Sequence, residues 1–165
     1  MGRPQLHRDL QRADWHRYQI LTKRAERLAE LNDRLPWAPH IWQGVTVEHP
    51  DYADRIALLR ETGAQVKFVS LEPLLAPMPS LNLRDIQWVI VGGESGPGAR
   101  PMLAEWVIEI QAQCRTAGTA FYFKQWGGVF KKRHGRLLHG RTWDERPSES
   151  TPTTRMPQAH DWLPA

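Results

Sequence analysis

The sequence predicts an α/β fold, a partial parallel (β/α) barrel of about five strands joined by crossover helices. Short apolar runs rich in β-branched and aromatic residues alternate with segments of helical periodicity, the pattern of a parallel sheet. The chain has 165 residues, 41% of them hydrophobic, enough for the core of one domain. We assign the barrel to residues 1–146. Residues 147–165, rich in Pro, Ser and Thr, are expected to form a disordered tail.

The strands are predicted where apolar runs end in polar residues. They are Tyr18–Lys23, Ile41–Glu48, Val66–Glu72, Trp88–Gly92 and Ala120–Gln125.

The connecting segments differ in their helical signals. Residues 25–35 repeat leucine at a spacing of three and four, which predicts an amphipathic helix, and residues 50–63 show the same spacing between a proline and a glycine. Residues 74–86 contain Pro77 and Pro79 and leave room for a turn or two of helix. Residues 103–118 predict a helix that ends at Gly118, with Cys114 on its apolar face as a core residue.

Several classes of protein are excluded by composition. No run approaches the roughly 18 apolar residues of a membrane span, and the polar first residues do not resemble a signal peptide, so we expect a cytoplasmic protein. The single cysteine allows no internal disulfide and no cysteine-held cluster from this chain alone. The histidines show no HExxH or HxxxH spacing, so no metal site is predicted.

The net charge of +4 is concentrated after the last predicted strand. Two interpretations remain open, a solvated basic face and a patch that binds nucleic acid. The basic residues concerned are Lys131, Lys132, Arg133, Arg136 and Arg141.

Ionisable and polar side chains follow each predicted strand. Because parallel strands direct their carboxyl ends to one side, these residues are expected to share one mouth. A blander explanation is that strands end in polar residues because the chain leaves the core there. The candidates are Lys23, Glu48, Glu72, Glu94, Lys124 and Gln125.

A glycine-rich segment follows the fourth strand, in VIVGGESGPGARPM. Gly92 and Gly93 expose backbone amides beside Ser95, as a loop that touches a phosphate, ribose or carboxylate requires, and Arg100 could close on an anion. A tight structural turn is the competing interpretation. Trp126, after the last strand, either stacks on a planar ligand or anchors the core.

The ordered motifs LTKR, WQGVTVE, KFVSLEPLL, WVIVGGESGPGARPM, FKQWGG and GRTWDE resemble the phage-protein family known as gp-thirty-seven/gp-sixty-eight. This is a domain of unknown function related to radical S-adenosylmethionine enzymes. The resemblance extends from about residue 13 to residue 146. It implies a partial barrel and, in full-length members, a three-cysteine motif holding a [4Fe–4S] cluster and S-adenosylmethionine.

The chain resembles the C-terminal portion of that family and lacks the N-terminal cysteine motif. The resemblance implies that Lys23 and Lys124 face substrate or a carboxylate. The candidate substrate-binding residues also include Arg100, Gln125 and Trp126. The residues implied to surround the methionine and ribose of the cofactor are Glu48, Glu72, Gly92, Gly93 and Glu94, and Ser95 is a further candidate for cofactor binding.

The sequence is compatible with three functions. The chain is a radical S-adenosylmethionine-like portion that is inactive alone, a nucleotide- or nucleic-acid-binding module that uses the glycine-rich loop and the basic segment, or a non-functional gene fragment. The first predicted strand would leave an unpaired sheet edge, which predicts marginal stability or self-association.

Overall fold

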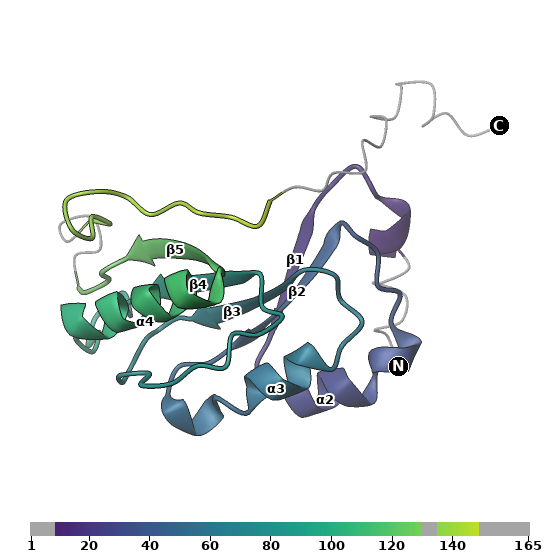
Figure 1. The fold of residues 1–165 in the computed structure, drawn as a ribbon, viewed down its shortest axis with the longest axis horizontal. Helices are drawn as coiled ribbons and strands as arrows, with labels where there is room; N and C mark the ends of the chain where they lie inside the picture. The colour runs from purple at the N-terminus through teal and green to yellow at the C-terminus, as the bar shows by residue number, and fades with distance from the viewer. Residues whose placement is uncertain (1–8, 130–134, 149–165) are drawn as a thin grey trace.

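A five-stranded, all-parallel sheet forms the centre of the molecule (Figure 1). The computed structural model describes residues 9–129 and 135–148. Its strand order β1-β2-β3-β4-β5 follows the chain, and helices lie between strands, so the predicted α/β class is confirmed. The strands are β1 (Tyr18–Thr22), β2 (Ile41–Thr46), β3 (Lys67–Leu71), β4 (Trp88–Gly92) and β5 (Ala120–Gln125).

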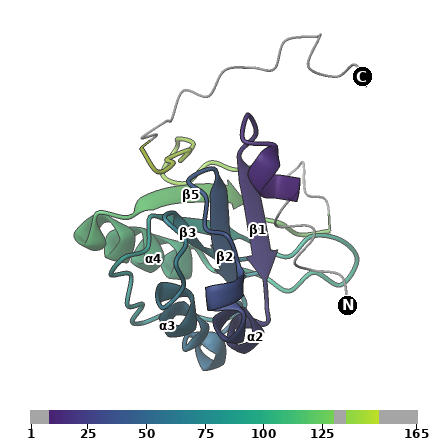
Figure 2. The ribbon, with the colours of Figure 1, turned by 90° about the vertical axis from the view of Figure 1, so that its right-hand side faces the viewer.

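A short helical segment at residues 9–12 precedes β1, and three further helices cover one face of the sheet, as both ribbon views show (Figures 1 and 2). They are α2 (Ala25–Glu30), α3 (Arg55–Arg60) and α4 (Ala104–Ala117), with 3₁₀ turns at Asn32–Arg34 and Pro50–Tyr52. Successive right-handed crossovers place helices on the same side when neighbouring strands are consecutive, as in the wall of a (β/α) barrel. The main core lies between these two layers, and it includes Val45, Val69, Val91, Leu28, Leu59 and Ile110.

Helix α2 is shorter than its leucine repeat predicts, because it gives way to the 3₁₀ turn that begins at Asn32. The side-chain oxygen of Asn32 accepts hydrogen bonds from the amide of Gly63 (2.8 Å) and the indole of Trp37 (3.0 Å). Through these hydrogen bonds, Asn32 links the connector between β1 and β2 to the connector between β2 and β3. The predicted end of α4 is confirmed, since Gly118 adopts a left-handed conformation with φ of 68°.

The opposite face of the sheet carries aromatic residues toward the amino ends of the strands. Trp42, Phe68 and Trp88 form a second buried cluster there. Trp88 packs edge-on against Trp42, with ring centroids 5.9 Å apart, and against Tyr122, at 5.8 Å. Gly44 makes room for this cluster, because a Cβ at that position would collide with the Phe68 ring. We call this the open face, since the helices do not cover it.

The outer edge of β5 is covered by residues 143–145. Tyr122 pairs with Asp144 in an isolated antiparallel bridge, and the Phe123 amide donates to the Trp143 carbonyl (2.9 Å). The Phe121 amide donates to the Glu145 carboxylate (2.9 Å). The GRTWDE segment therefore closes this side of the sheet.

Two expectations concern the rest of the chain. Within the described residues, no helix is long and apolar enough to cross a membrane. The predicted tail falls almost entirely outside the described residues, which end at 148.

Candidate functional site

Four charged side chains stand in a row on the open face, at the carboxyl ends of the strands. They are Lys23 after β1, Glu48 after β2, Glu72 after β3 and Lys124 within β5, and we call them the charged rim. The residues before Glu48, Glu72 and Lys124 belong to the main core, and Thr22, before Lys23, is in register with the core residue Val45. Because successive side chains of a strand point to opposite faces, all four charged side chains lie on the open face.

Glu48 is the most enclosed member of the rim, with 7% of the residue exposed. Its carboxylate pairs with Lys23, and Arg55 at the start of α3 approaches its Oε2 at 3.2 Å. Arg55 also donates to the Thr46 carbonyl at 2.8 Å, which fixes its position. Burial raises the pKa of Glu48, but the hydrogen bond from Lys23 and the charges of Lys23 and Arg55 outweigh it. The net pKa lies below its ordinary value of 4.5.

Glu72 and Lys124 form the second ion pair of the rim, with Oε2 and Nζ 2.9 Å apart. The pair spans strand β4 at Gly92, where no side chain stands between the partners. A Cβ on Gly92 would come within 3.1 Å of Glu72 Oε1, so glycine leaves the room that this pair uses.

The two rim glutamates are neighbours. Thr46 is in register with Ser70, so Glu48 and Glu72, two residues further along adjacent strands, fall side by side on the open face. The order along the rim is therefore cation, carboxylate, carboxylate, cation. Such a row presents a negative centre between two positive ends.

The glycine-rich loop after β4 is closed by an internal ion pair rather than open to an anion. Arg100 donates through Nε and Nη2 to the two oxygens of Glu94, both at 2.8 Å, and its amide donates to the same carboxylate at 2.9 Å. These hydrogen bonds lower the pKa of Glu94 to about 2, and the same carboxylate raises the pKa of Arg100.

The glycine-rich loop is also fastened to the segment after β5. The Gln125 side chain donates to Ser95 Oγ at 3.0 Å, and the Gly128 amide donates to the Glu94 carbonyl at 2.7 Å. Gly93 lies so close to the Trp126 carbonyl that a Cβ would collide with it. The structural interpretation of these glycines, a tight turn, therefore has direct support at Gly93.

A cavity of about 480 Å³ lies beside this loop. Its lining includes Arg100, Met102, Trp126 and Gly128. The Trp126 indole donates to the Leu137 carbonyl at 2.8 Å and its ring packs against Phe123, with centroids 4.8 Å apart, so Trp126 combines an anchoring role with a place at a cavity wall.

The sequence-predicted site residues thus form two adjoining groups. The first group is the charged rim together with Gly92, over which the Glu72–Lys124 pair passes, and its members are Lys23, Glu48, Glu72, Gly92 and Lys124. The remaining predicted residues belong to the glycine-rich loop and its attachment to β5, namely Gly93, Glu94, Ser95, Arg100, Gln125 and Trp126.

Sequence reasoning missed Arg55 as a member of the site. Its only signal is its position, since the first turn of a helix that follows a parallel strand lies at the strand's carboxyl end. Arg55 also lies over the Tyr52 ring, with 4.2 Å from the guanidinium carbon to the ring centroid, and this contact helps direct it toward Glu48.

The two described members of the basic segment make intramolecular contacts. Arg136 pairs with Asp144 and lies over the Tyr122 ring, while Arg141 stacks on Trp143 with its guanidinium carbon 3.4 Å from the ring centroid. Both arginines help to hold the segment that covers β5. The remaining basic residues, Lys131, Lys132 and Arg133, lie outside the described residues.

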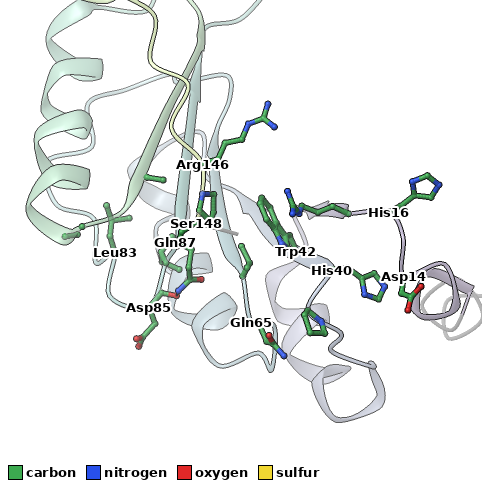
Figure 3. Close-up of a pocket in the computed structure, with 18 of the residues that line it drawn as sticks. Asp14, His16, His40, Trp42, Gln65, Leu83, Asp85, Gln87, Arg146 and Ser148 are labelled. Atoms are coloured by element: carbon green, nitrogen blue, oxygen red, sulfur yellow. The ribbon is translucent and has the colours of Figure 1, made fainter. Parts of the chain in front are cut away.

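A second cavity, of about 860 Å³, lies at the amino ends of the strands, away from the rim (Figure 3). Trp42 forms part of its wall. The other residues labelled around it come from the segments that lead into β1 and β2, from the turns before β3 and β4, and from the segment up to Ser148. None of the sequence-predicted site residues lines it.

The described residues offer no metal centre. Among residues 9–129 and 135–148, no three His, Cys, Asp or Glu side chains gather in a way that could hold a metal ion. Cys114 is buried on α4, where burial, followed by the charge of Glu145, raises the pKa of its thiol to about 12. It is a core residue, as predicted.

Fold and rim together define a parallel α/β domain with a charged mouth at the carboxyl ends of its strands. Residues 3–147 match the family described as "protein of unknown function (DUF5131)", and the chain belongs to this family. No curated protein and no solved structure matches the chain.

Proposed function

We propose that this chain is the ligand-facing portion of a radical S-adenosylmethionine-like domain, and that the charged rim binds S-adenosylmethionine. The ordered motifs that resemble the gp-thirty-seven/gp-sixty-eight family support the relationship, and they also support a phage origin. The observation that carries the proposal is the order of charge along the rim, with Glu48 and Glu72 side by side between Lys23 and Lys124.

The charges of S-adenosylmethionine complement this row. Its sulfonium and α-ammonium groups are cations that suit the paired glutamates, and its carboxylate suits a lysine at either end. The rim residues are already paired with each other, and on binding they exchange these partners for groups of the ligand. The free energy of binding is therefore the difference between the contacts made to the ligand and the ion pairs that are lost. The two rim lysines are the exposed members, with 62% of the Lys23 side chain and 47% of the Lys124 side chain accessible, so either can turn toward a ligand.

The iron–sulfur cluster of the related enzymes does not fit this chain. Such a cluster is held by several cysteine thiolates, whereas the chain has one cysteine. That residue, Cys114, is buried with a pKa raised to about 12. We therefore assign no radical step to these residues and propose that the chain is inactive in radical chemistry on its own. Anaerobic reconstitution with iron and sulfide is expected to give no four-iron absorbance.

Calorimetric titration tests the binding proposal. S-adenosylmethionine is expected to bind, and S-adenosylhomocysteine, which lacks the methyl group and positive charge at sulfur, is expected to bind about tenfold more weakly. Glu72→Gln should remove this preference. Glu30→Gln, on the exposed side of α2, is the matched control and should leave it intact.

Absence of heat with S-adenosylmethionine at millimolar concentration would contradict the proposal. Equal affinity for the two compounds would contradict the role of the paired glutamates, provided that circular dichroism shows each variant folded.

A further inference from the structure

The outer edge of β1 is a feature that bears on interaction with another polypeptide. The Tyr18 amide donates to the His40 carbonyl (2.9 Å), which sets the register of the β1–β2 ladder. In a parallel ladder alternate residues bond to one neighbour, so Tyr18, Ile20 and Thr22 face β2. The amides and carbonyls of Gln19 and Leu21 therefore point to the outer edge.

This edge differs from the edge of β5. Residues 143–145 accept hydrogen bonds from the outward amides of β5. By contrast, no other segment among the described residues hydrogen-bonds to the outward amides and carbonyls of β1. Devices that normally protect an edge strand are also missing within it, since YQILT contains no charge and no proline. Leu21 is 48% exposed beside these outward-facing groups.

The charges around β1 indicate what kind of strand would bind there. Residues 16–24 include Arg17, Lys23 and Arg24 and contain no Asp or Glu. Arg17 lies over the Trp42 ring and Lys23 is paired with Glu48, while Arg24 is exposed. Antiparallel pairing of β1 with a second copy of itself, centred on Ile20, would set Arg17 opposite Lys23 at both ends. Like charges directly opposite each other destabilise a strand pair, which disfavours self-pairing.

We propose that the edge of β1 accepts an extended segment of another polypeptide, with an apolar centre and acidic residues at its ends. Main-chain bonds to Gln19 and Leu21 would supply affinity, and Leu21 would meet an apolar side chain on the open face. The acidic ends would meet the basic residues that flank the strand. Lys23 also belongs to the charged rim, but the main-chain bonds to Gln19 and Leu21 do not depend on the binding of S-adenosylmethionine there.

Two labelled peptides test the proposal. Both have a Val-Thr-Val-Thr-Val centre, flanked by glutamates in one and by lysines in the other. Fluorescence anisotropy at low salt should show the acidic peptide binding about tenfold more tightly. Hydrogen exchange should slow at the amides of Gln19 and Leu21 when that peptide binds.

Two variants examine the edge itself. Leu21→Pro removes an outward N–H without removing a bond to β2, and should abolish binding while the protein remains folded by circular dichroism. Arg24→Glu leaves the ladder unchanged and should reduce the preference for the acidic peptide, so it keeps the test valid if the proline variant fails to fold. Arg115→Glu, on the exposed side of α4, is the matched control.

Three results would overturn the proposal. The amides of Gln19 and Leu21 could already be protected in the free protein. The two peptides could bind equally or not at all. Light scattering could show a dimer that Leu21→Pro dissociates, which would assign the edge to a second copy of the chain.

Discussion

Lys124 on β5 reaches Glu72 after β3 across an intervening strand, with 2.9 Å between Nζ and Oε2, because Gly92 on β4 carries no side chain. Residues from two strands that are not neighbours are thereby joined on the open face. The glycine that sequence reasoning attributed to a ligand contact has a structural role here, which is to leave the path of this ion pair clear.

Replacing that glycine should uncouple the pair. In a double-mutant cycle of Glu72→Gln and Lys124→Met, we expect a coupling of about 0.2 to 1 kcal/mol, since both side chains are partly exposed. The same cycle in a Gly92→Val background should give a coupling near zero. An unchanged coupling there would show that the partners meet by another path.

Neutralising Glu48 should destabilise the fold more than neutralising an exposed glutamate. Glu48→Gln leaves Arg55, whose side chain is 15% exposed, without its carboxylate, and should lower the free energy of unfolding by about 1 to 3 kcal/mol. Glu30→Gln breaks an exposed pair with Arg27 and should change it by less than about 0.5 kcal/mol. Urea denaturation compares the two variants, and equal effects would contradict the enclosed position of Glu48.

The acid dependence of stability should carry a contribution from Glu48. Its pKa is lowered in the folded protein, so its contribution is complete above the unfolded value of 4.5 and is lost as pH falls through the lower folded pKa. The difference in stability between the wild type and Glu48→Gln should therefore shrink below pH 4.5. A difference that grows on acidification would have the wrong sign.

Glu94 should titrate far below an ordinary glutamate. Hydrogen bonds from Arg100 lower its pKa to about 2, and Arg100→Gln should return it toward the ordinary value. Carbon-detected NMR titration of the side-chain carboxyl follows both proteins. If the two titrations coincide, the ion pair does not close the glycine-rich loop in solution.

Cys114 should be inert toward thiol reagents in the folded protein. Burial raises its pKa to about 12, so the fraction of thiolate at pH 8 is small and the sulfur is also out of reach. Reaction with a disulfide reagent should occur only at the rate of unfolding and become fast in guanidinium chloride. Rapid labelling under native conditions would remove Cys114 from the core between α4 and the sheet.

Much of the fold follows from local patterns in the sequence. Alternating apolar runs located every strand, and Gly118 marked the end of α4, because both signals act within one element. The shortening of α2 could not be predicted, since it depends on bonds from Gly63 and Trp37 to Asn32, which are brought together by folding.

The candidate site was predictable only in part for the same reason. The topology of parallel strands brings Glu48, Glu72 and Lys124 to one mouth, which a sequence can indicate. The ion-pair partners of these residues are harder to predict from the sequence. Arg100 was expected to bind an external anion, but it pairs with Glu94. Arg55 was not predicted, because its contact with Glu48 depends on where α3 begins.

The most direct test of the central claim is an amide NMR titration of the protein with S-adenosylmethionine. Binding at the charged rim predicts that the largest shift changes gather at residues 23, 48, 72, 92 and 124 and their strand neighbours, with little change around Trp42 and His40 at the opposite strand ends. Shifts confined to that opposite cavity, or no shifts at saturating ligand, would contradict the assignment of the rim as the binding site.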